Sequence, residues 1–129
     1  MRLSFAVAAA SSLVVASAAL AGDAKPLSGP QLQKFVAGKT VVLHTSIGGV
    51  PITYSGNGTM SGAAKSMAMY AGRERDKGRW RVLGDQICQK WDVWLEGKSY
   101  CFTFRLDGRT VHWRGLDGRS GTATIASTN

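Results

Sequence analysis

The sequence predicts an α+β fold that is mainly β: one short N-terminal helix packed on an antiparallel meander sheet or small barrel of about six to eight strands. Three observations predict it. From Lys39 onward, short runs rich in β-branched and aromatic residues follow one another. Asn57-Gly58, Asp107-Gly108 and Asp117-Gly118 are typical two-residue hairpin turns between such runs. Only one helical pattern precedes them.

The first 21 residues have the pattern of a cleavable secretory signal peptide. Arg2 precedes an apolar stretch from Phe5 to Leu20, and Ala19-Leu20-Ala21 forms a small-x-small cleavage site. The stretch is slightly short for a bilayer span of ~20 residues and is not followed by the Lys or Arg of a membrane anchor. We therefore expect residues 1–21 to be removed and residues 22–129 to form a single β-rich domain outside the cytoplasm.

The predicted helix begins near Ser28, a good N-cap, and ends at Gly38, which suits a left-handed C-terminal residue. Pro30 is favourable in the first turn of a helix. The apolar side chains fall at helical spacing on one stripe, which must pack on a sheet. This stripe consists of Leu32, Phe35 and Val36.

Cys88 and Cys101 are the only two cysteines. In an exported protein of this size an even cysteine count predicts a disulfide, and neither cysteine belongs to a Cys-x-x-Cys motif. A bond closing this short loop should contribute roughly 3 kcal/mol to stability.

Eight strands are predicted between the turns. The segment Ala63–Lys77 has neither strand nor helical character throughout, so Ala64–Ala71 is expected to form either a helical turn or a loop. The predicted strands are Thr40–Ser46, Ile52–Ser55, Gly58–Ser61, Arg79–Leu83, Gln86–Trp91, Tyr100–Leu106, Thr110–Gly115 and Thr122–Ala126.

The turn Asp107-Gly108 sets a first register. If these two residues are the turn centre, Phe104 opposes Val111 and Phe102 opposes Trp113, which places four apolar side chains on one face. This hairpin therefore predicts which face of the sheet is the core.

The cysteine pair sets a second register. Direct opposition of Cys88 and Cys101 puts Ile87 against Phe102, so both hairpins direct Phe102 to the core. In the last hairpin, a three-residue loop or a bulge is needed to bring Ile125 to the same face. The predicted core is Trp80, Val82, Ile87, Tyr100, Phe102, Phe104, Val111 and Trp113.

The charge favours anionic partners, because 16 Lys and Arg stand against 8 Asp and Glu, a formal net charge of +8. Strand alternation places one set of cations together on the sheet face that carries the disulfide. This candidate anion-binding set is Arg79, Arg81, Lys90, Arg105 and Arg114.

The succession Leu27–Leu32, Gly38–Val41 and Gly78–Val82, followed by the cysteine pair and Asp107-Gly108, resembles small exported proteins of alphaproteobacteria. That family is catalogued as a domain of unknown function, so the resemblance implies no activity and no site residues. It implies a β domain in the periplasm or secreted by a Gram-negative bacterium.

We therefore expect a non-enzymatic binding or envelope-associated accessory protein with a basic face for an anionic envelope component or acidic protein. Nucleic acid is not an expected partner, since the protein is exported. The main alternative is a carrier that holds a small ligand in an apolar barrel lumen. That lumen would be lined by Trp80, Phe102, Phe104 and Trp113.

Chemistry has few candidate residues in this sequence. A small hydrolase would use His44 or His112 with a carboxylate, but no spacing links either histidine to one. Thioether ligation of Cu(I) would need the methionines of the middle segment, Met60, Met67 and Met69. Such residues more often fill core gaps, so no metal and no cofactor is expected.

Overall fold

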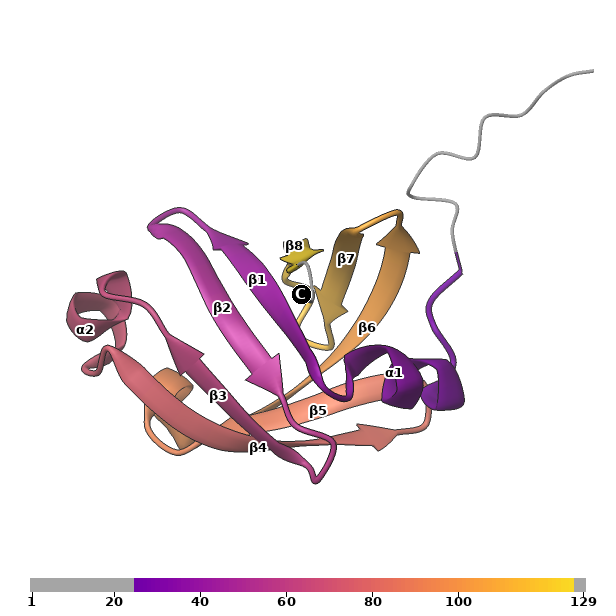
Figure 1. Ribbon diagram of the computed structural model, residues 1–129, viewed down its shortest axis with the longest axis horizontal. Helices are drawn as coiled ribbons and strands as arrows, with labels where there is room; N and C mark the ends of the chain where they lie inside the picture. Colours follow the sequence, from indigo (N-terminus) through magenta and orange to yellow (C-terminus); the bar gives the residue numbers. More distant parts are fainter. Residues whose placement is uncertain (1–24, 127–129) are drawn as a thin grey trace, which may run out of the picture.

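The computed structural model describes residues 25–126; the predicted signal peptide lies outside these residues. Eight antiparallel strands follow each other in chain order, and the last strand pairs with the first, so the sheet is a closed barrel (Figure 1). The prediction of a mainly β, antiparallel fold is confirmed, and of the predicted alternatives the sheet forms the barrel. The strands are β1 (Lys39–Thr45), β2 (Gly48–Tyr54), β3 (Thr59–Ala63), β4 (Arg75–Leu83), β5 (Gln86–Trp91), β6 (Ser99–Asp107), β7 (Thr110–Gly115) and β8 (Ser120–Ile125).

The two ends of the barrel differ. At the closed end lie helix α1 (Gly29–Val36) and the β4–β5 turn, joined by a 2.8 Å hydrogen bond from the Gly29 backbone N–H to Asp85 Oδ1. At the opposite, open end lie the β1–β2, β3–β4, β5–β6 and β7–β8 connections (Figure 1). Two of these contain short helices, α2 (Ser66–Ala71) and the 3₁₀ segment η2 (Trp94–Gly97).

Helix α1 forms where the sequence predicts a helix. Ser28 Oγ accepts the Gln31 backbone N–H, and Gln31 Oε1 accepts the Ser28 backbone N–H, which makes a capping box. The helix ends at Val36, before the predicted limit at Gly38. Leu32 and Val36 are completely buried, and the helix contacts β1, β4 and β5. None of the helices among residues 25–126 combines the length and apolarity needed to span a bilayer.

The disulfide Cys88–Cys101 is present, as predicted. It joins directly opposed residues of β5 and β6, with Ile87 opposite Phe102 as expected. Cys88 faces outward, beside Arg81 of β4, but it is only 3% exposed. The bond therefore ties two adjacent strands at the centre of the chain.

The predicted register of the β6–β7 hairpin is wrong by two residues. Phe104 opposes Trp113 rather than Val111, and Asp107 stays in the strand opposite Thr110. The turn is therefore centred on Gly108 and the residue after it, and only Gly108 has positive φ. This is a type II′ turn, in which only the first of the two central residues has positive φ. Since a shift of two preserves the alternation, the predicted core face is still correct.

The other two Xaa-Gly turns are three-residue loops rather than the predicted two-residue turns. Ser55 pairs with Thr59 around Gly56–Gly58, and Gly115 pairs with Arg119 around Leu116–Gly118. The last residue of each loop is a glycine with positive φ, the geometry of a loop that ends in a left-handed residue. The second loop is the three-residue loop that the sequence predicted as one way to bring Ile125 to the core face, and Ile125 does pack against the core.

β2 and β4 each begin four residues earlier than predicted. Helix α2 occupies part of the ambiguous segment. β2 begins at Gly48 and β4 at Arg75, in stretches with low intrinsic β propensity. Both extensions pair with neighbouring strands, so the tertiary structure overrides local preference. The core of buried apolar residues comprises Leu32, Val36, Val41, Val50, Ile52, Tyr54, Met60, Met67, Trp80, Ile87, Trp91, Trp94, Phe104, Val111 and Ala123.

The alternation of inward and outward side chains on β7 predicts that substitutions at neighbouring positions differ in their effect on stability. Trp113 faces inward, with its ring perpendicular to Phe102 at 5.5 Å, whereas His112 faces outward. We expect Trp113→Ala to lower the free energy of unfolding by about 3 kcal/mol, and His112→Ala by less than about 1 kcal/mol. Urea denaturation followed by circular dichroism measures both; equal losses would contradict the assignment of faces.

Candidate functional site

The interior of the barrel is filled at the closed end and hollow toward the open end. Side chains from α1 and the strand ends, including Leu32, Ile87 and Val111, fill the closed half. Toward the open end remains a cavity of about 260 Å³. An eight-stranded barrel has an interior just wide enough to be filled by side chains or to hold one small ligand, and this protein combines the two.

The cavity wall is predominantly apolar and aromatic. The rings of Trp91 and Trp94 are in contact at a centroid distance of 4.7 Å with their planes tilted by 51°, and Phe102 packs edge to face on Trp113. These rings come from the β5–β6 region and β7, while β1 and β2 supply aliphatic side chains. The apolar and aromatic residues lining the cavity are Val41, Leu43, Ile47, Val50, Ile52, Tyr54, Met67, Tyr70, Trp91, Trp94, Leu95, Tyr100, Phe102, Phe104, Trp113 and Ala123.

A few polar groups interrupt this wall. The Tyr54 hydroxyl donates a 2.9 Å hydrogen bond to Gln89 Oε1, so these two side chains are already paired. The Trp113 indole Nε1–H is buried and has no hydrogen-bond acceptor among the described residues. A buried donor left unpaired costs about 1–3 kcal/mol, so an acceptor reaching it would be favourable.

Gly121 is the reason the Trp113 ring fits inside the barrel. It pairs with Trp113 across β7 and β8, and a Cβ at this position would lie 2.6 Å from the indole ring. Any larger residue at 121 would displace the ring. A residue without a side chain therefore creates the space for the aromatic wall.

A buried carboxylate holds the β5–β6 connection over the open end. Asp76 is 6% exposed, and its Oδ2 accepts backbone N–H groups from Val93 at 2.8 Å and Trp94 at 2.7 Å. The Trp94 indole N–H donates to the Arg73 carbonyl at 2.8 Å. These bonds fix Trp94 as one wall of the cavity.

Two ion pairs lie on the connections at the open end. Lys98 Nζ is 2.8 Å from Glu96 Oε2, and its side-chain hydrogen bond lowers the pKa of Glu96. The backbone N–H and then the side chain of Arg119 bind Asp117, which lowers the pKa of that carboxyl. Arg119 also lies over the ring of Tyr100, at 5.8 Å from the centroid. Both acids beside the opening are thus neutralised locally.

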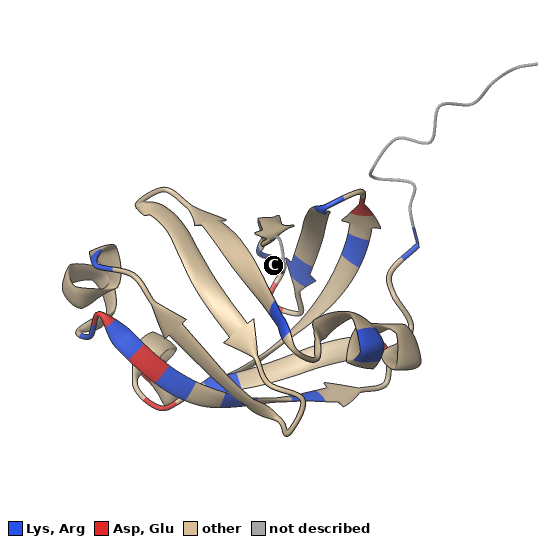
Figure 2. Cartoon of the chain, in the orientation of Figure 1, with Lys and Arg blue, Asp and Glu red and all other residues tan. Residues whose placement is uncertain are grey.

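The predicted anion-binding residues all belong to the outer surface, but closure of the barrel divides them. Arg79 and Lys90 are opposed residues of β4 and β5, with Arg81 two residues further along. Arg105 and Arg114 lie on β6 and β7, beyond the disulfide. The structure adds Arg75 and Lys77, which extend the exposed cations along β4 (Figure 2).

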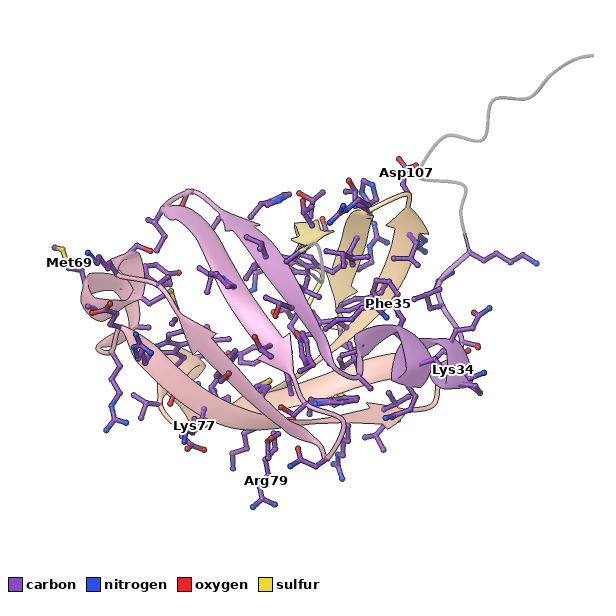
Figure 3. The ribbon with its side chains drawn as sticks, in the orientation of Figure 1. Lys34, Phe35, Met69, Lys77, Arg79 and Asp107 are labelled. Carbon is purple, nitrogen blue, oxygen red and sulfur yellow. A yellow bond between two sulfur atoms is a disulfide. The ribbon has the colours of Figure 1, made fainter. Side chains whose placement is uncertain are left out.

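A second hollow, here called the outer groove, lies outside the barrel beside these cations. It has a volume of about 480 Å³, and its lining is mainly polar or charged. Arg73, Arg75 and Lys77 line it together with two acids, Asp76 and Asp92. Figure 3 shows Lys77 and Arg79 pointing away from the barrel.

The residues considered for chemistry are not assembled into a centre. His44 lies on the exposed surface, with Nδ1 2.8 Å from Thr122 Oγ1 and Nε2 2.7 Å from Thr124 Oγ1. Met67 is buried, whereas Met69 is 97% exposed, so these two sulfurs do not share one environment. Within residues 25–126, no group of three or more His, Cys, Asp and Glu side chains converges as a metal site would require.

Three of the four residues predicted for an apolar lumen line the cavity: Phe102, Phe104 and Trp113. The fourth, Trp80, lies outside its lining, and its indole N–H donates to the carbonyls of Ser55 and Thr59. The sequence reasoning missed Gln89 and Trp91, although alternation from the inward-facing Ile87 would have identified both. It also missed Trp94, because no periodic pattern covers a single 3₁₀ turn.

No family model, curated protein or solved structure matches this chain. The cavity and the outer surface are therefore interpreted from their own geometry.

The buried tyrosine of the cavity predicts a pH dependence. Burial raises the pKa of Tyr54 above its usual value of 10.0. The raised pKa means that protonated Tyr54 contributes fully to the free energy of unfolding below pH 10. This contribution is lost as the pH rises above 10, because the unfolded chain then releases a proton that the folded protein retains. We expect wild type to lose about 1.4 kcal/mol more than Tyr54→Phe per pH unit above 10. Denaturant unfolding between pH 9 and about pH 11.5 measures this difference, and parallel losses would refute it.

Proposed function

We propose that this protein binds one small apolar ligand inside the barrel. The observation that carries the proposal is the aromatic-lined cavity at the open end, with a volume of about 260 Å³. Apolar walls with a few polar groups are typical of small-molecule sites. The predicted signal peptide and the disulfide are consistent with an exported carrier, which is the alternative that the sequence left open.

The size of the cavity limits the ligand. An apolar cavity of about 150 Å³ is large enough for one benzene molecule. A cavity of about 260 Å³ therefore suits one or two fused rings or a short acyl chain, and it is too small for a steroid-sized molecule. The unpaired indole N–H of Trp113 favours a ligand with a hydrogen-bond acceptor.

Occupying the cavity with a protein side chain tests the proposal. Leu43 lines the cavity, whereas the adjacent Val42 faces outward on the same strand. We expect Leu43→Trp to weaken binding of the uncharged fluorescent probe 1-naphthylamine, which has two fused rings, by at least about tenfold, since the added ring takes up the ligand's volume.

The matched control is Val42→Trp, which adds the same ring to the outer surface. It should leave the affinity for the probe within about twofold. Fluorescence titration measures both variants, after circular dichroism has shown that they are folded. Loss of affinity in both, or in neither, would contradict binding inside the barrel.

A second candidate function is the binding of an anionic polymer on the outer face, as expected from the sequence. It is favoured by the basic row, which we define as Arg75, Lys77, Arg79 and Arg81 on β4 with Lys90 beside them. All five side chains are exposed, and alternate positions on β4 lie about 6.6 Å apart. Such an array concentrates positive potential beside the outer groove.

Charge reversal separates a local effect from the net charge. We expect Arg79→Glu combined with Arg81→Glu to abolish retention on heparin at physiological salt, where the Debye length is about 8 Å. The pair Lys25→Glu and Lys34→Glu changes the net charge equally but lies outside the row. Chromatography with a salt gradient compares the two, and equal loss of retention would leave only a net-charge effect.

A further inference from the structure

We infer that the open end of the barrel is a docking surface for an anionic lipid bilayer. The inference rests on the proposed function only in one respect: the ligand would pass between the bilayer and the cavity. The docking itself depends on the side chains that surround the opening.

Large exposed apolar side chains are concentrated around this opening. Among the described residues six such side chains exist, and five of them lie on the four open-end connections. Met69 is 97% exposed, Tyr70 71% and Leu116 69%. The five residues, here called the apolar rim, are Ile47, Met69, Tyr70, Leu95 and Leu116. The sixth, Leu83, lies at the closed end.

The backbone conformation of one connection also favours this exposure. Leu95 and Glu96 have φ of 55° and 59°, and they are the only non-glycine residues with positive φ in the described part of the chain. Such a conformation is strained in a residue with a side chain and is retained where the surrounding structure requires it. The Asp76 bonds to Val93 and Trp94 hold this segment in place beside the cavity.

The rim is continuous with the interior. Ile47, Tyr70 and Leu95 each line the cavity as well as reaching its opening. Apolar side chains therefore line part of the path from the opening into the barrel, beside the polar residues Thr45, Ser46, Asp117 and Arg119.

The charges around the rim complement an anionic surface. Helix α2 presents Met69 and Tyr70 between two exposed cations, Lys65 and Arg73, with Met69 directed outward at its tip (Figure 3). Apolar and tyrosine side chains flanked by Lys and Arg are typical of segments that lie in the interface of a bilayer.

The acids near the opening do not oppose this attraction strongly. Glu96 and Asp117 are in ion pairs with Lys98 and Arg119. Glu74 lies between two arginines in the chain, and Asp92 lines the outer groove with Arg73, Arg75 and Lys77.

A bilayer fits this surface better than a folded partner. The rim side chains project from four separate connections and surround the opening of the cavity, so they form neither a helix groove nor a strand edge. A bilayer accepts separate apolar side chains without matching their shape, and its anionic headgroups interact favourably with nearby cations.

The experiment uses two identical substitutions at opposite ends of the barrel. Leu116→Ser removes an exposed leucine of the rim, and Leu83→Ser removes an exposed leucine of the closed end. Binding of the purified protein to vesicles of phosphatidylglycerol and phosphatidylethanolamine is measured by co-sedimentation. We expect Leu116→Ser alone to weaken binding at least about fivefold, and Leu83→Ser to leave it within about twofold. Adding Met69→Ser to Leu116→Ser should weaken binding at least about tenfold in total.

Each other outcome overturns the docking proposal. Equal effects at the two ends, or no binding of wild type to these vesicles, would show that the rim does not meet a bilayer. A wild-type dimer that the rim substitutions convert to a monomer would show that a second copy covers the rim.

Titration of the same variants with the soluble naphthylamine probe, without vesicles, tests the cavity separately. Unchanged probe affinity with lost vesicle binding supports the docking surface. Retained probe affinity in a wild type that does not bind vesicles overturns the docking surface and leaves the proposed ligand site intact. Failure of the probe to bind wild type overturns the ligand site, whatever the vesicle result.

Discussion

The pairing of β8 with β1 is the constraint on which the rest of the structure depends. Val41, Val42 and Leu43 are opposite Ile125, Thr124 and Ala123, and these pairs turn a meander into a closed barrel. Closure leaves no exposed sheet edge and gives every strand an inside and an outside. A small domain then has a protected interior that is wider than its core residues alone would fill.

The inside and outside of single strands carry different properties. On β4, Trp80 is buried in the core while Arg79 and Arg81 on either side of it are exposed. The period of two therefore separates an apolar interior from a basic exterior within the same nine residues. The proposed ligand binding inside the barrel and the proposed electrostatic attraction outside it therefore use different residues.

The two ends of the barrel are equally distinct. At the closed end, α1 contributes Leu32 and Val36 to the core, and its N-terminus is bonded to Asp85 in the β4–β5 turn. At the open end the connections place aromatic rings around the cavity instead of filling it. The barrel is therefore packed with buried side chains at the end covered by α1, whereas a cavity remains at the end that carries the rim.

Local patterns in the sequence determined much of this architecture. The capping residues of α1, the alternation that buries Phe102 and Phe104, and the opposition of Cys88 and Cys101 follow from spacing of 3.6 or 2 residues. The turn glycines were also predicted from sequence, although the type of turn, and hence the β6–β7 register, was not. Turn type depends on which residue takes positive φ, and that is decided together with strand pairing.

Only the tertiary structure decided how distant residues meet. Tyr54 and Gln89 come together across the barrel, and Trp113 finds its space over Gly121. The rim likewise combines five residues from four connections, none of which has a pattern of its own. The physical reason is that sequence periodicity specifies which way a side chain points, whereas the barrel's closure and the packing at each end specify what it meets.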